Sequence, residues 1–322
     1  MYPTLFTIGN WSVPTYTLLL DLGLILGLLL TYFEGKRQLK DGTLALDLGL
    51  WMVIGGIVGG RIGYVLANWQ AFSEDWARAI RIWEGGLSFH GAFLTGMLVM
   101  LVFSLLRLRD GKPISFWVLG DVITPGLALG ITFGWAACLM GGSAYGVLGE
   151  GFGYAILPDL YGIAASRFAT QLAGLAFSLA LFLGVWLLRG HWPFSGASFL
   201  MYLLLYFAGQ FFLEFTRGDE ALYFGPWRLA QWLDLGLALA AAVGLLVLWW
   251  QARGAVQQVS TEEGEPEEAE EAEGETPPAE DEASQSEEGV SQPEEVAPPV
   301  VEETEGSERT DRQEPQATEE PG

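Results

Sequence analysis

The stretch Glu84-Gly-Gly-Leu-Ser-Phe-His90-Gly91-Ala-Phe-Leu-Thr95-Gly96 leads from a polar segment into an apolar run, Ala92 to Leu106. The chain has only two histidines, and His90 lies where this run begins. A neutral imidazole accepts a proton and its cation binds an anion, and polar groups within lipid usually serve a function. The pattern therefore predicts a site at the start of a membrane span. The same residues also fit a histidine that only caps a helix, and the local sequence leaves both interpretations open.

The charge of the chain is divided unevenly between two parts. Of the 322 residues 51% are hydrophobic, yet the formal net charge is −23. Residues 1–259 carry 15 acidic and 14 basic side chains, whereas residues 260–322 carry 24 acidic and two basic ones. The acidity therefore describes a tail and not the ligand of the main domain. We expect a membrane domain over residues 1–254 and a separate tail over residues 255–322.

Seven stretches are apolar over roughly the 20 residues that a helix needs to cross a bilayer. They run from about Tyr16 to Phe33, Leu44 to Ala67, Ala92 to Leu106, Phe116 to Met140, Phe168 to Leu188, Ala197 to Phe215 and Leu229 to Trp250. All the lysines lie in loops that follow odd-numbered spans, which the positive-inside rule places in the cytoplasm. Residues 1–14 lack the basic segment of a cleavable signal peptide. The sequence predicts an all-α polytopic membrane protein with seven spans, its N-terminus outside and its C-terminus inside.

Two segments outside the spans have patterns of their own. Between Asn68 and Trp83 apolar residues recur every three or four positions, which predicts a short interfacial helix or an amphipathic helix packed on the bundle. Residues 255–322 contain no Phe, Trp, Tyr, Ile or Leu, so they cannot bury enough apolar surface to offset chain entropy. We expect a disordered, Glu- and Pro-rich cytoplasmic tail, with no essential partner as the simpler interpretation.

Ionisable side chains within the spans are the best functional candidates. The set comprises Arg61, His90, Asp121, Glu214 and Arg217, with Tyr16, Gln171 and Gln231 as neutral companions. In the expected topology most of them lie toward the outer face, whereas Asp121 enters from the cytoplasmic side and fits a structural role. The guanidinium groups of Arg61 and Arg217 match phosphate oxygens, which predicts a pocket for an anionic headgroup. Alternatively, each arginine pairs with Glu214 or a carbonyl and only holds helices together.

Several short motifs follow one another through the spans. They are Gly59-Gly-Arg61-Ile-Gly-Tyr64-Val-Leu66, Trp83-Glu-Gly-Gly-Leu-Ser-Phe-His90-Gly91, Asp121-Val-Ile-Thr-Pro125, Thr170-Gln171-Leu172, Glu214-Phe-Thr-Arg217 and Leu229-Ala-Gln231-Trp232. In type and order they resemble the motifs of the phosphatidylglycerol–prolipoprotein diacylglyceryl transferases, and Tyr16 matches a tyrosine in the first span of that family. The resemblance covers roughly residues 16–250.

One central motif departs from the family pattern. The family's G-R-x-G-N-x-x-N-G-E-x-x-G aligns with residues 134–146 of this chain. Tryptophan stands in place of an arginine implicated in phospholipid binding, and the other replaced positions are Cys138, Gly141 and Ser143; Gly134, Gly142 and Gly146 are retained. An indole cannot neutralise a phosphate as a guanidinium does, so the resemblance implies that Trp135 lies in a rebuilt phosphate site.

The resemblance implies a reaction and its participants. A diacylglyceryl group passes from phosphatidylglycerol to the lipobox cysteine thiol of a prolipoprotein, and glycerol phosphate is released, in the bacterial plasma (inner) membrane. The implied partners are phosphatidylglycerol and preprolipoprotein signal peptides, without nucleic acid, metal or organic cofactor. The implied catalytic residues are His90, as base or phosphate donor, and Arg217, which binds the phosphate. The implied substrate-binding residues are Tyr16, Arg61, Gly91, Gln171, Glu214, Gly142 and Gly146.

The altered central motif leaves two other functions open. One is a related transferase that acts on another acceptor or phospholipid. The other is a catalytically silent lipid-binding member of the same fold, with the acidic tail recruiting partners. Cys138 fits a covalent relay or, more simply, a buried core residue, since small thiols commonly fill cores.

Overall fold

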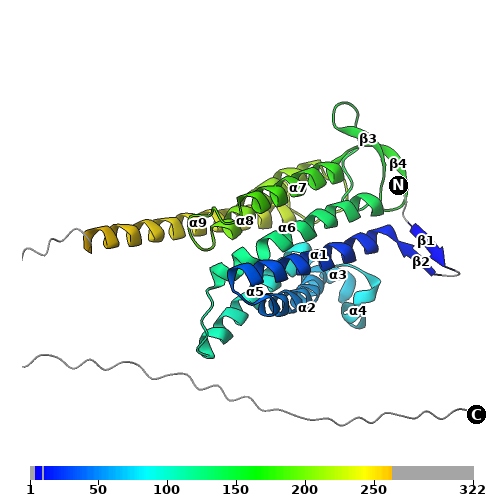
Figure 1. Cartoon of the computed structure of the whole chain (residues 1–322). Helices are drawn as coiled ribbons and strands as arrows, with labels where there is room; N and C mark the ends of the chain where they lie inside the picture. Colours follow the sequence, from blue (N-terminus) through cyan, green and yellow to red (C-terminus); the bar gives the residue numbers. More distant parts are fainter. Residues whose placement is uncertain (1–3, 9–10, 263–322) are drawn as a thin grey trace, which may run out of the picture. The chain divides into compact units, whose positions relative to one another are not determined.

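The chain forms long helices joined by short hairpins and turns. A computed structural model describes residues 4–8 and 11–262. The elements are β1 (Thr4–Ile8), β2 (Trp11–Pro14), α1 (Thr15–Gln38), α2 (Gly42–Ala67), α3 (Trp69–Phe72), α4 (Ala77–Ile80), η1 (Ile82–Glu84), α5 (Phe89–Arg109), α6 (Phe116–Gly141), β3 (Tyr154–Pro158), β4 (Ala164–Phe168), α7 (Thr170–Leu188), α8 (Ala197–Leu213), η2 (Glu214–Thr216), β5 (Tyr223–Phe224), β6 (Trp227–Arg228) and α9 (Leu229–Glu262). Figure 1 shows α1 running alongside α6 and close to α2.

Seven of the described helices are long and apolar enough to cross a membrane. They are α1, α2, α5, α6, α7, α8 and α9, and their apolar segments are 19 to 26 residues long. At 1.5 Å per residue this corresponds to about 30–40 Å, the thickness of a bilayer with its interfaces. Each helix coincides with one of the predicted spans, so the predicted all-α polytopic fold is confirmed.

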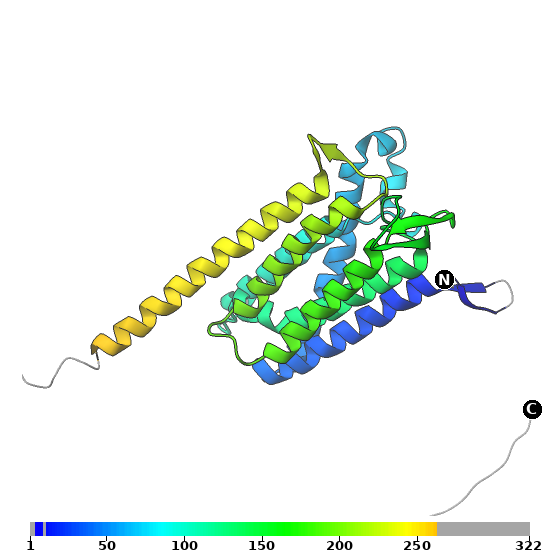
Figure 2. The same ribbon diagram turned by 90° about the horizontal axis from the view of Figure 1, so that it is seen from above.

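Among the described residues there are three antiparallel hairpins that the sequence does not predict. They pair β1 with β2, β3 with β4 and β5 with β6, and their strands are only two to five residues long. Strands this short give too few alternations for a period of two to be recognised. Both views place β1–β2 and β3–β4 at the same end of the helices as α3 and α4 (Figures 1 and 2).

The predicted helix over Asn68 to Trp83 is wrong as a single element. The segment is divided into α3, α4 and the 3-10 turn η1. The division falls at Ser73 and Asp75, whose side chains bond to nearby backbone: Ser73 Oγ donates to the carbonyl of Gln70 (2.8 Å), and Asp75 Oδ1 accepts from the N–H of Ala77 (3.1 Å). Such local bonds compete with a continuous helix.

The apolar core lies largely between α6 and α8, where Phe199, Tyr202 and Phe207 are fully buried. Asp121 of α6 fastens this core at the start of α8. Its two carboxylate oxygens accept from the N–H groups of Gly196 (2.6 Å) and Phe199 (3.0 Å). A helix start leaves such N–H groups without partners, so Asp121 has the structural role that its position suggested.

Glycines bring two pairs of helices into backbone contact. A Cβ at Gly59 of α2 would overlap the side chain of Thr95 and the carbonyl of Gly91, and a Cβ at Gly91 of α5 would overlap the carbonyl of Gly59. Gly27 of α1 and Gly126 of α6 make the same kind of contact. In lipid, where no hydrophobic effect drives helices together, such close packing of small residues stabilises the bundle.

We expect Gly91→Val to separate α2 from α5, because the new side chain has no room against Gly59. Overpacking of this kind costs about 1–3 kcal/mol, which should lower the thermal unfolding midpoint of the purified protein in detergent. Gly184→Val is the matched control, since a Cβ at Gly184 of α7 meets no atom within 4 Å. Equal midpoints for the two variants would contradict the packing role of Gly91.

The predicted end of the membrane domain at Gly254 falls inside a helix. The backbone of α9 is helical to Glu262, so the predicted tail is not irregular from its first residue. The remainder of that predicted disordered tail, residues 263–322, lies outside the described residues.

Candidate active site

A cavity of about 790 Å³ lies among the helices and is lined mainly by apolar side chains and glycines. Its polar and ionisable lining residues include Tyr16, His90, Cys138, Ser143, Tyr206, Gln210, Glu214, Arg217, Asp219 and Asp234. His90 lies in the first turn of α5, and Arg217 directly follows η2. The two residues are 127 positions apart in the chain, yet both line this cavity. A mostly apolar cavity with a few polar groups is the usual form of a small-molecule or lipid site.

Arg217 is held by two carboxylates. Its Nε donates to Asp219 Oδ1 (3.0 Å), one terminal nitrogen donates to the other oxygen of Asp219, and the second terminal nitrogen donates to Glu214. Burial by itself favours a neutral guanidinium, but the hydrogen bonds that Arg217 donates to Asp219 and the charges of Asp219 and Glu214 outweigh it and raise the pKa of Arg217. Arg217 is therefore a permanent cation at the wall of the cavity.

Asp219 is the partner that Arg217 would have to release in order to bind another anion. Burial raises the pKa of the Asp219 carboxyl, but the hydrogen bond and charge of Arg217, with a smaller contribution from Arg228, reverse this and leave that pKa below its ordinary value. The fork-to-fork pairing is the geometry in which a guanidinium also binds a phosphate. The carboxylate of Asp219 thus occupies this fork of Arg217 in the structure.

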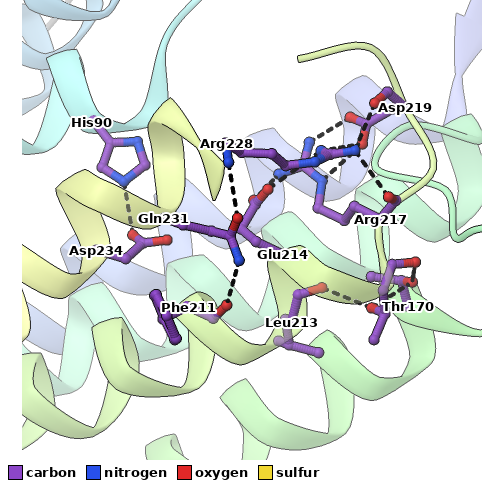
Figure 3. Close-up of polar contacts among 11 residues, drawn as sticks. His90, Thr170, Phe211, Leu213, Glu214, Arg217, Asp219, Arg228, Gln231 and Asp234 are labelled. Carbon is purple, nitrogen blue, oxygen red and sulfur yellow. Dashed lines mark hydrogen bonds and ion pairs between the residues drawn. The ribbon is translucent and has the colours of Figure 1, made fainter. Parts of the chain in front are cut away.

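Arg228 completes a charge cluster, which we define as Glu214, Arg217, Asp219 and Arg228. Its guanidinium donates to Asp219 Oδ1 (3.0 Å) and Glu214 Oε2 (3.3 Å) and to the carbonyls of Arg217 (2.9 Å) and Asp219 (2.7 Å). Arg228 is only 4% exposed and does not line the cavity. Two cations and two anions make the cluster electrically neutral, and Arg228 fixes the loop that carries Arg217 (Figure 3).

Gln231 joins the charge cluster to α8. Its side-chain oxygen accepts from the N–H of Arg228 (2.9 Å), and its side-chain nitrogen donates to the carbonyl of Phe211 (3.4 Å). This glutamine is therefore a structural connector in the described part of the chain.

His90 is paired with a carboxylate from the last span. Its Nε2 lies 2.8 Å from Asp234 Oδ1, and Figure 3 shows the imidazole of α5 pointing down onto Asp234 of α9. The start of α5 is capped by Ser88, whose Oγ accepts from the N–H of Gly91 (3.3 Å). Because Ser88 provides the side-chain cap, His90 remains directed into the cavity.

Arg61 has a different environment from Arg217. Its guanidinium donates to the carbonyls of Arg78 (2.6 Å), Ala79 (2.9 Å) and Gly86 (3.1 Å) and also to that of Gly85. It is 6% exposed and is not among the residues that line the cavity. The structure therefore corresponds to the alternative in which Arg61 binds carbonyls, and it does not form the expected phosphate-binding pair with Arg217.

Gln171, Gly142 and Gly146 support the loop between α6 and α7 and do not line the cavity. Gln171 is completely buried, and its side-chain nitrogen donates to the carbonyl of Ser143 (3.1 Å). Gly142 has a φ of 68° and lies against the carbonyl of Asp159, where a Cβ has no space.

Gly146 holds the segment of Arg217. The two residues form an isolated antiparallel bridge, and the N–H of Gly218 donates to the carbonyl of Tyr145 (2.8 Å). A Cβ at Gly146 would overlap the carbonyl of Phe168. Gly146 therefore positions Arg217 through the backbone, whereas Gly91 acts through helix packing.

The altered central motif borders the same cavity. Trp135, Cys138 and Ser143 all line it, together with Tyr16. The Trp135 ring packs so closely on Gly174 of α7 that a Cβ there would overlap the indole, and Tyr16 packs likewise on Gly141. The Trp135 indole, which replaces the family's arginine, is thus a buried part of the cavity wall. Among the described residues that line the cavity, Arg217 is the one arginine.

Three residues of this site, namely Asp219, Arg228 and Asp234, are not among the candidates that the sequence predicts. Asp234 lies inside the predicted seventh span, and a carboxylate there is as costly as the ionisable groups that were selected. That signal was present in the sequence. Asp219 and Arg228 lie between the sixth and seventh predicted spans, where charged residues are ordinary, so nothing local distinguishes them. Among the described residues no group of three His, Cys, Asp or Glu side chains is arranged to hold a metal ion.

The fold and the site define a multi-pass membrane protein with a mainly apolar cavity among its helices, which is lined by both a histidine–carboxylate pair and a carboxylate-bound arginine. A family model described as prolipoprotein diacylglyceryl transferase matches residues 3–250. The chain therefore belongs to the prolipoprotein diacylglyceryl transferase family.

Curated relatives are similar over most of their length. A protein of Acaryochloris marina is 32% identical over 262 residues, which covers 77% of this chain and 90% of the relative. A protein of Gloeobacter violaceus is 33% identical over 270 residues, which covers 80% and 95%. A protein of Listeria innocua is 29% identical over 252 residues, which covers 76% and 88%. Each of these relatives is named phosphatidylglycerol–prolipoprotein diacylglyceryl transferase, and the resemblance found in the motifs is confirmed.

Proposed function

We propose that this chain transfers the diacylglyceryl group of phosphatidylglycerol to the lipobox cysteine thiol of prolipoproteins. Membership of the family supports the reaction. The observation that carries the assignment to particular residues is that His90 and Arg217 line one cavity. The reaction needs a group that receives the thiol proton and a cation that stabilises the phosphate leaving group, and the cavity supplies one of each.

Arg217 is the phosphate-binding residue in this proposal. The phosphodiester oxygens take the place of the Asp219 carboxylate on the guanidinium fork, while Glu214 keeps the third donor of Arg217 occupied and its side chain in place. As the bond between glycerol carbon and phosphate oxygen breaks, negative charge grows on the phosphate, and the fixed cation stabilises that charge.

His90 is the proton acceptor. The thiolate and not the thiol is the nucleophile, so the cysteine proton passes to the imidazole as the sulfur attacks the glycerol carbon. A sulfur–carbon bond forms, the carbon–oxygen bond to phosphate breaks, and glycerol phosphate leaves. His90 thus acts on the attacking thiol, and Arg217 acts on the leaving phosphate of the same displacement.

The other predicted site residues are assigned to positioning. Tyr16 borders the cavity beside Gly141 and contacts the bound lipid. Gln171, Gly142 and Gly146 fix the loop that packs against the segment of Arg217. Arg61 fixes the turn before α5 through carbonyls and thereby the start of the helix that carries His90.

We place the protein in the bacterial plasma membrane with the cavity's charged end outside and α9 ending in the cytoplasm. The basic residues that support this orientation lie in the last turns of α1 and α5 and in the loops that follow them, and basic segments are retained on the cytoplasmic side. A reporter enzyme that works only in the cytoplasm should therefore be active when it is fused after Gly254. Activity of an extracytoplasmic reporter at that position would contradict the orientation.

The test of the proposed function is complementation of a bacterial strain depleted of its own transferase. Expression of this chain should restore growth and the appearance of lipidated prolipoprotein, detected by its shift on a gel and by mass spectrometry of the modified cysteine. Purified chain in vesicles that contain phosphatidylglycerol should modify a lipobox peptide and release glycerol phosphate. Failure of both assays with folded protein would overturn the proposal.

Trp135 in the cavity wall and the full occupation of Arg217 by carboxylates also support a second candidate function, a lipid-binding protein with no transferase activity or with another specificity. The same vesicle assay discriminates between the two. A chain that retains phosphatidylglycerol through purification but releases no glycerol phosphate would have the second function.

A further inference from the structure

We propose that Asp234 is a positioning residue for His90, which fixes the imidazole so that its Nδ1 receives the substrate proton. The inference rests on the proposed function for its chemical consequence, but the orientation itself is a property of the protein alone. The two side chains come from α5 and α9, more than 140 residues apart in the chain, and both line the cavity.

The geometry identifies which nitrogen of His90 is engaged. Asp234 Oδ1 lies 2.8 Å from Nε2, and an ionised carboxylate only accepts hydrogen bonds. Nε2 therefore carries the proton, and Nδ1 presents a lone pair. Among the described residues Nδ1 has no hydrogen-bond partner, so it is the nitrogen left for a ligand in the cavity (Figure 3).

The burial of Asp234 makes this contact more than an incidental surface pair. Asp234 is 2% exposed within the apolar part of α9, and a carboxylate there is costly unless it is paired. In the described part of the chain the histidine is its hydrogen-bonding partner among side chains. An apolar residue would fill the same space without the free-energy cost of burying a carboxylate. The presence of Asp234 therefore points to a role that compensates for this cost.

The chemical consequence follows from the proton balance of the transfer. When Nδ1 takes the thiol proton, the imidazole becomes a cation with both nitrogens protonated, and the Asp234 carboxylate stabilises that cation. The sulfur–carbon bond forms at the same time as the carbon–oxygen bond to phosphate breaks, and the proton leaves the imidazole with the released glycerol phosphate. Without Asp234 the ring is free to adopt the tautomer whose protonated nitrogen faces the thiol, which cannot accept the proton.

The orientation can be tested without any assay of activity. The chain has two histidines, so His191→Gln leaves His90 as the single one. This full-length variant, purified through a tag without histidine and labelled with 15N-histidine in lipid vesicles, should give solid-state NMR signals of a protonated Nε2 and an unprotonated Nδ1. Asp234→Asn in the same background should abolish this preference. A protonated Nδ1 in the parent protein would overturn the proposal.

The effect on the reaction is tested with Asp234→Asn and Asp234→Glu in the vesicle assay. We expect Asn to lower kcat by about 10²–10⁴-fold, the usual size of a general-base effect, with an unchanged KM for phosphatidylglycerol. Glu, which keeps the charge, should restore part of the activity. A merely structural Asp234 predicts a lowered unfolding midpoint and parallel changes in kcat and KM, and that result, like a kcat within twofold of the parent, would contradict the proposal.

The transferase function and the role of Asp234 can be disproved separately. If the parent protein has the expected tautomer but transfers no diacylglyceryl group, the orientation by Asp234 is supported and the proposed transferase function is wrong. If the parent protein is active and Asp234→Asn is equally active, the function is supported and the role of Asp234 is wrong.

Discussion

Arg217→Ala is expected to lower kcat/KM for diacylglyceryl transfer by about 10²–10³-fold, the usual effect of removing one preorganised charge that stabilises the transition state. The physical reason is that Arg217 is the arginine that lines the cavity in the described part of the chain. Arg61 donates to four backbone carbonyls, and Arg228 does not line the cavity. The measurement is the release of glycerol phosphate by purified protein in phosphatidylglycerol vesicles.

The single variant has a structural side effect that must be separated from catalysis. Among the described residues, removing Arg217 leaves Glu214 and Asp219 with only Arg228 as a cationic partner, and loss of one member of a buried ion pair costs about 3–5 kcal/mol. Arg217→Ala combined with Asp219→Asn restores a neutral cluster. We expect the double variant to fold and to remain inactive, and recovery of activity in it would contradict the phosphate-binding role.

Arg189→Ala is the matched control for the loss of an arginine. Arg189 follows α7 and lies over the ring of Trp186 near Glu34, outside the cavity. Its replacement should leave kcat/KM for transfer within about twofold of the parent value, as is usual for surface substitutions away from special features.

His90→Gln is expected to lower kcat by about 10²–10⁴-fold, because the amide cannot accept the thiol proton in the transition state. Glutamine is close in size and keeps a hydrogen-bond donor for Asp234, so the fold should be retained. The KM for phosphatidylglycerol should change little, since Arg217 and the apolar walls bind the lipid. The measurement is the rate of modification of a lipobox peptide at saturating lipid.

The chain supplies its own control for this substitution. His191→Gln changes the only other histidine, which is exposed in the loop after α7, and its rate of transfer should equal that of the parent protein. A His90→Gln variant as active as His191→Gln would exclude His90 as the base and would return it to the structural interpretation.

The sequence predicted the seven spans because each is an uninterrupted apolar segment of sufficient length, a property that needs no knowledge of its neighbours. It also predicted that His90 and Arg217 belong to one site, from their common outer side in the expected topology and from the ordered motifs. What it could not decide was the partner of each arginine. Arg61 and Arg217 are both arginines at the ends of apolar spans, yet one meets backbone carbonyls and the other carboxylates and a cavity.

The reason for this limit is that the hydrogen-bond acceptors of Arg61 are backbone carbonyls and not side chains. The carbonyls of Arg78, Ala79 and Gly86 turn inward only because the segment after α2 breaks into α3, α4 and η1. The sequence predicts one helix over Asn68 to Trp83, in which the carbonyls of Arg78 and Ala79 would bond to N–H groups of the same helix. The wrong element and the open question of Arg61 therefore have one cause.

The electrical neutrality of the charge cluster determines how an anionic lipid must enter. A phosphodiester that simply joined Glu214, Arg217, Asp219 and Arg228 would leave an uncompensated negative charge in a medium of low dielectric constant. Under the phosphate-binding role proposed for Arg217, we therefore expect entry to be an exchange, in which the Asp219 carboxylate leaves Arg217 as the headgroup binds and returns when the product departs. A site that exchanges one anion for another has the same net charge before and after each turnover, so it needs no separate counterion.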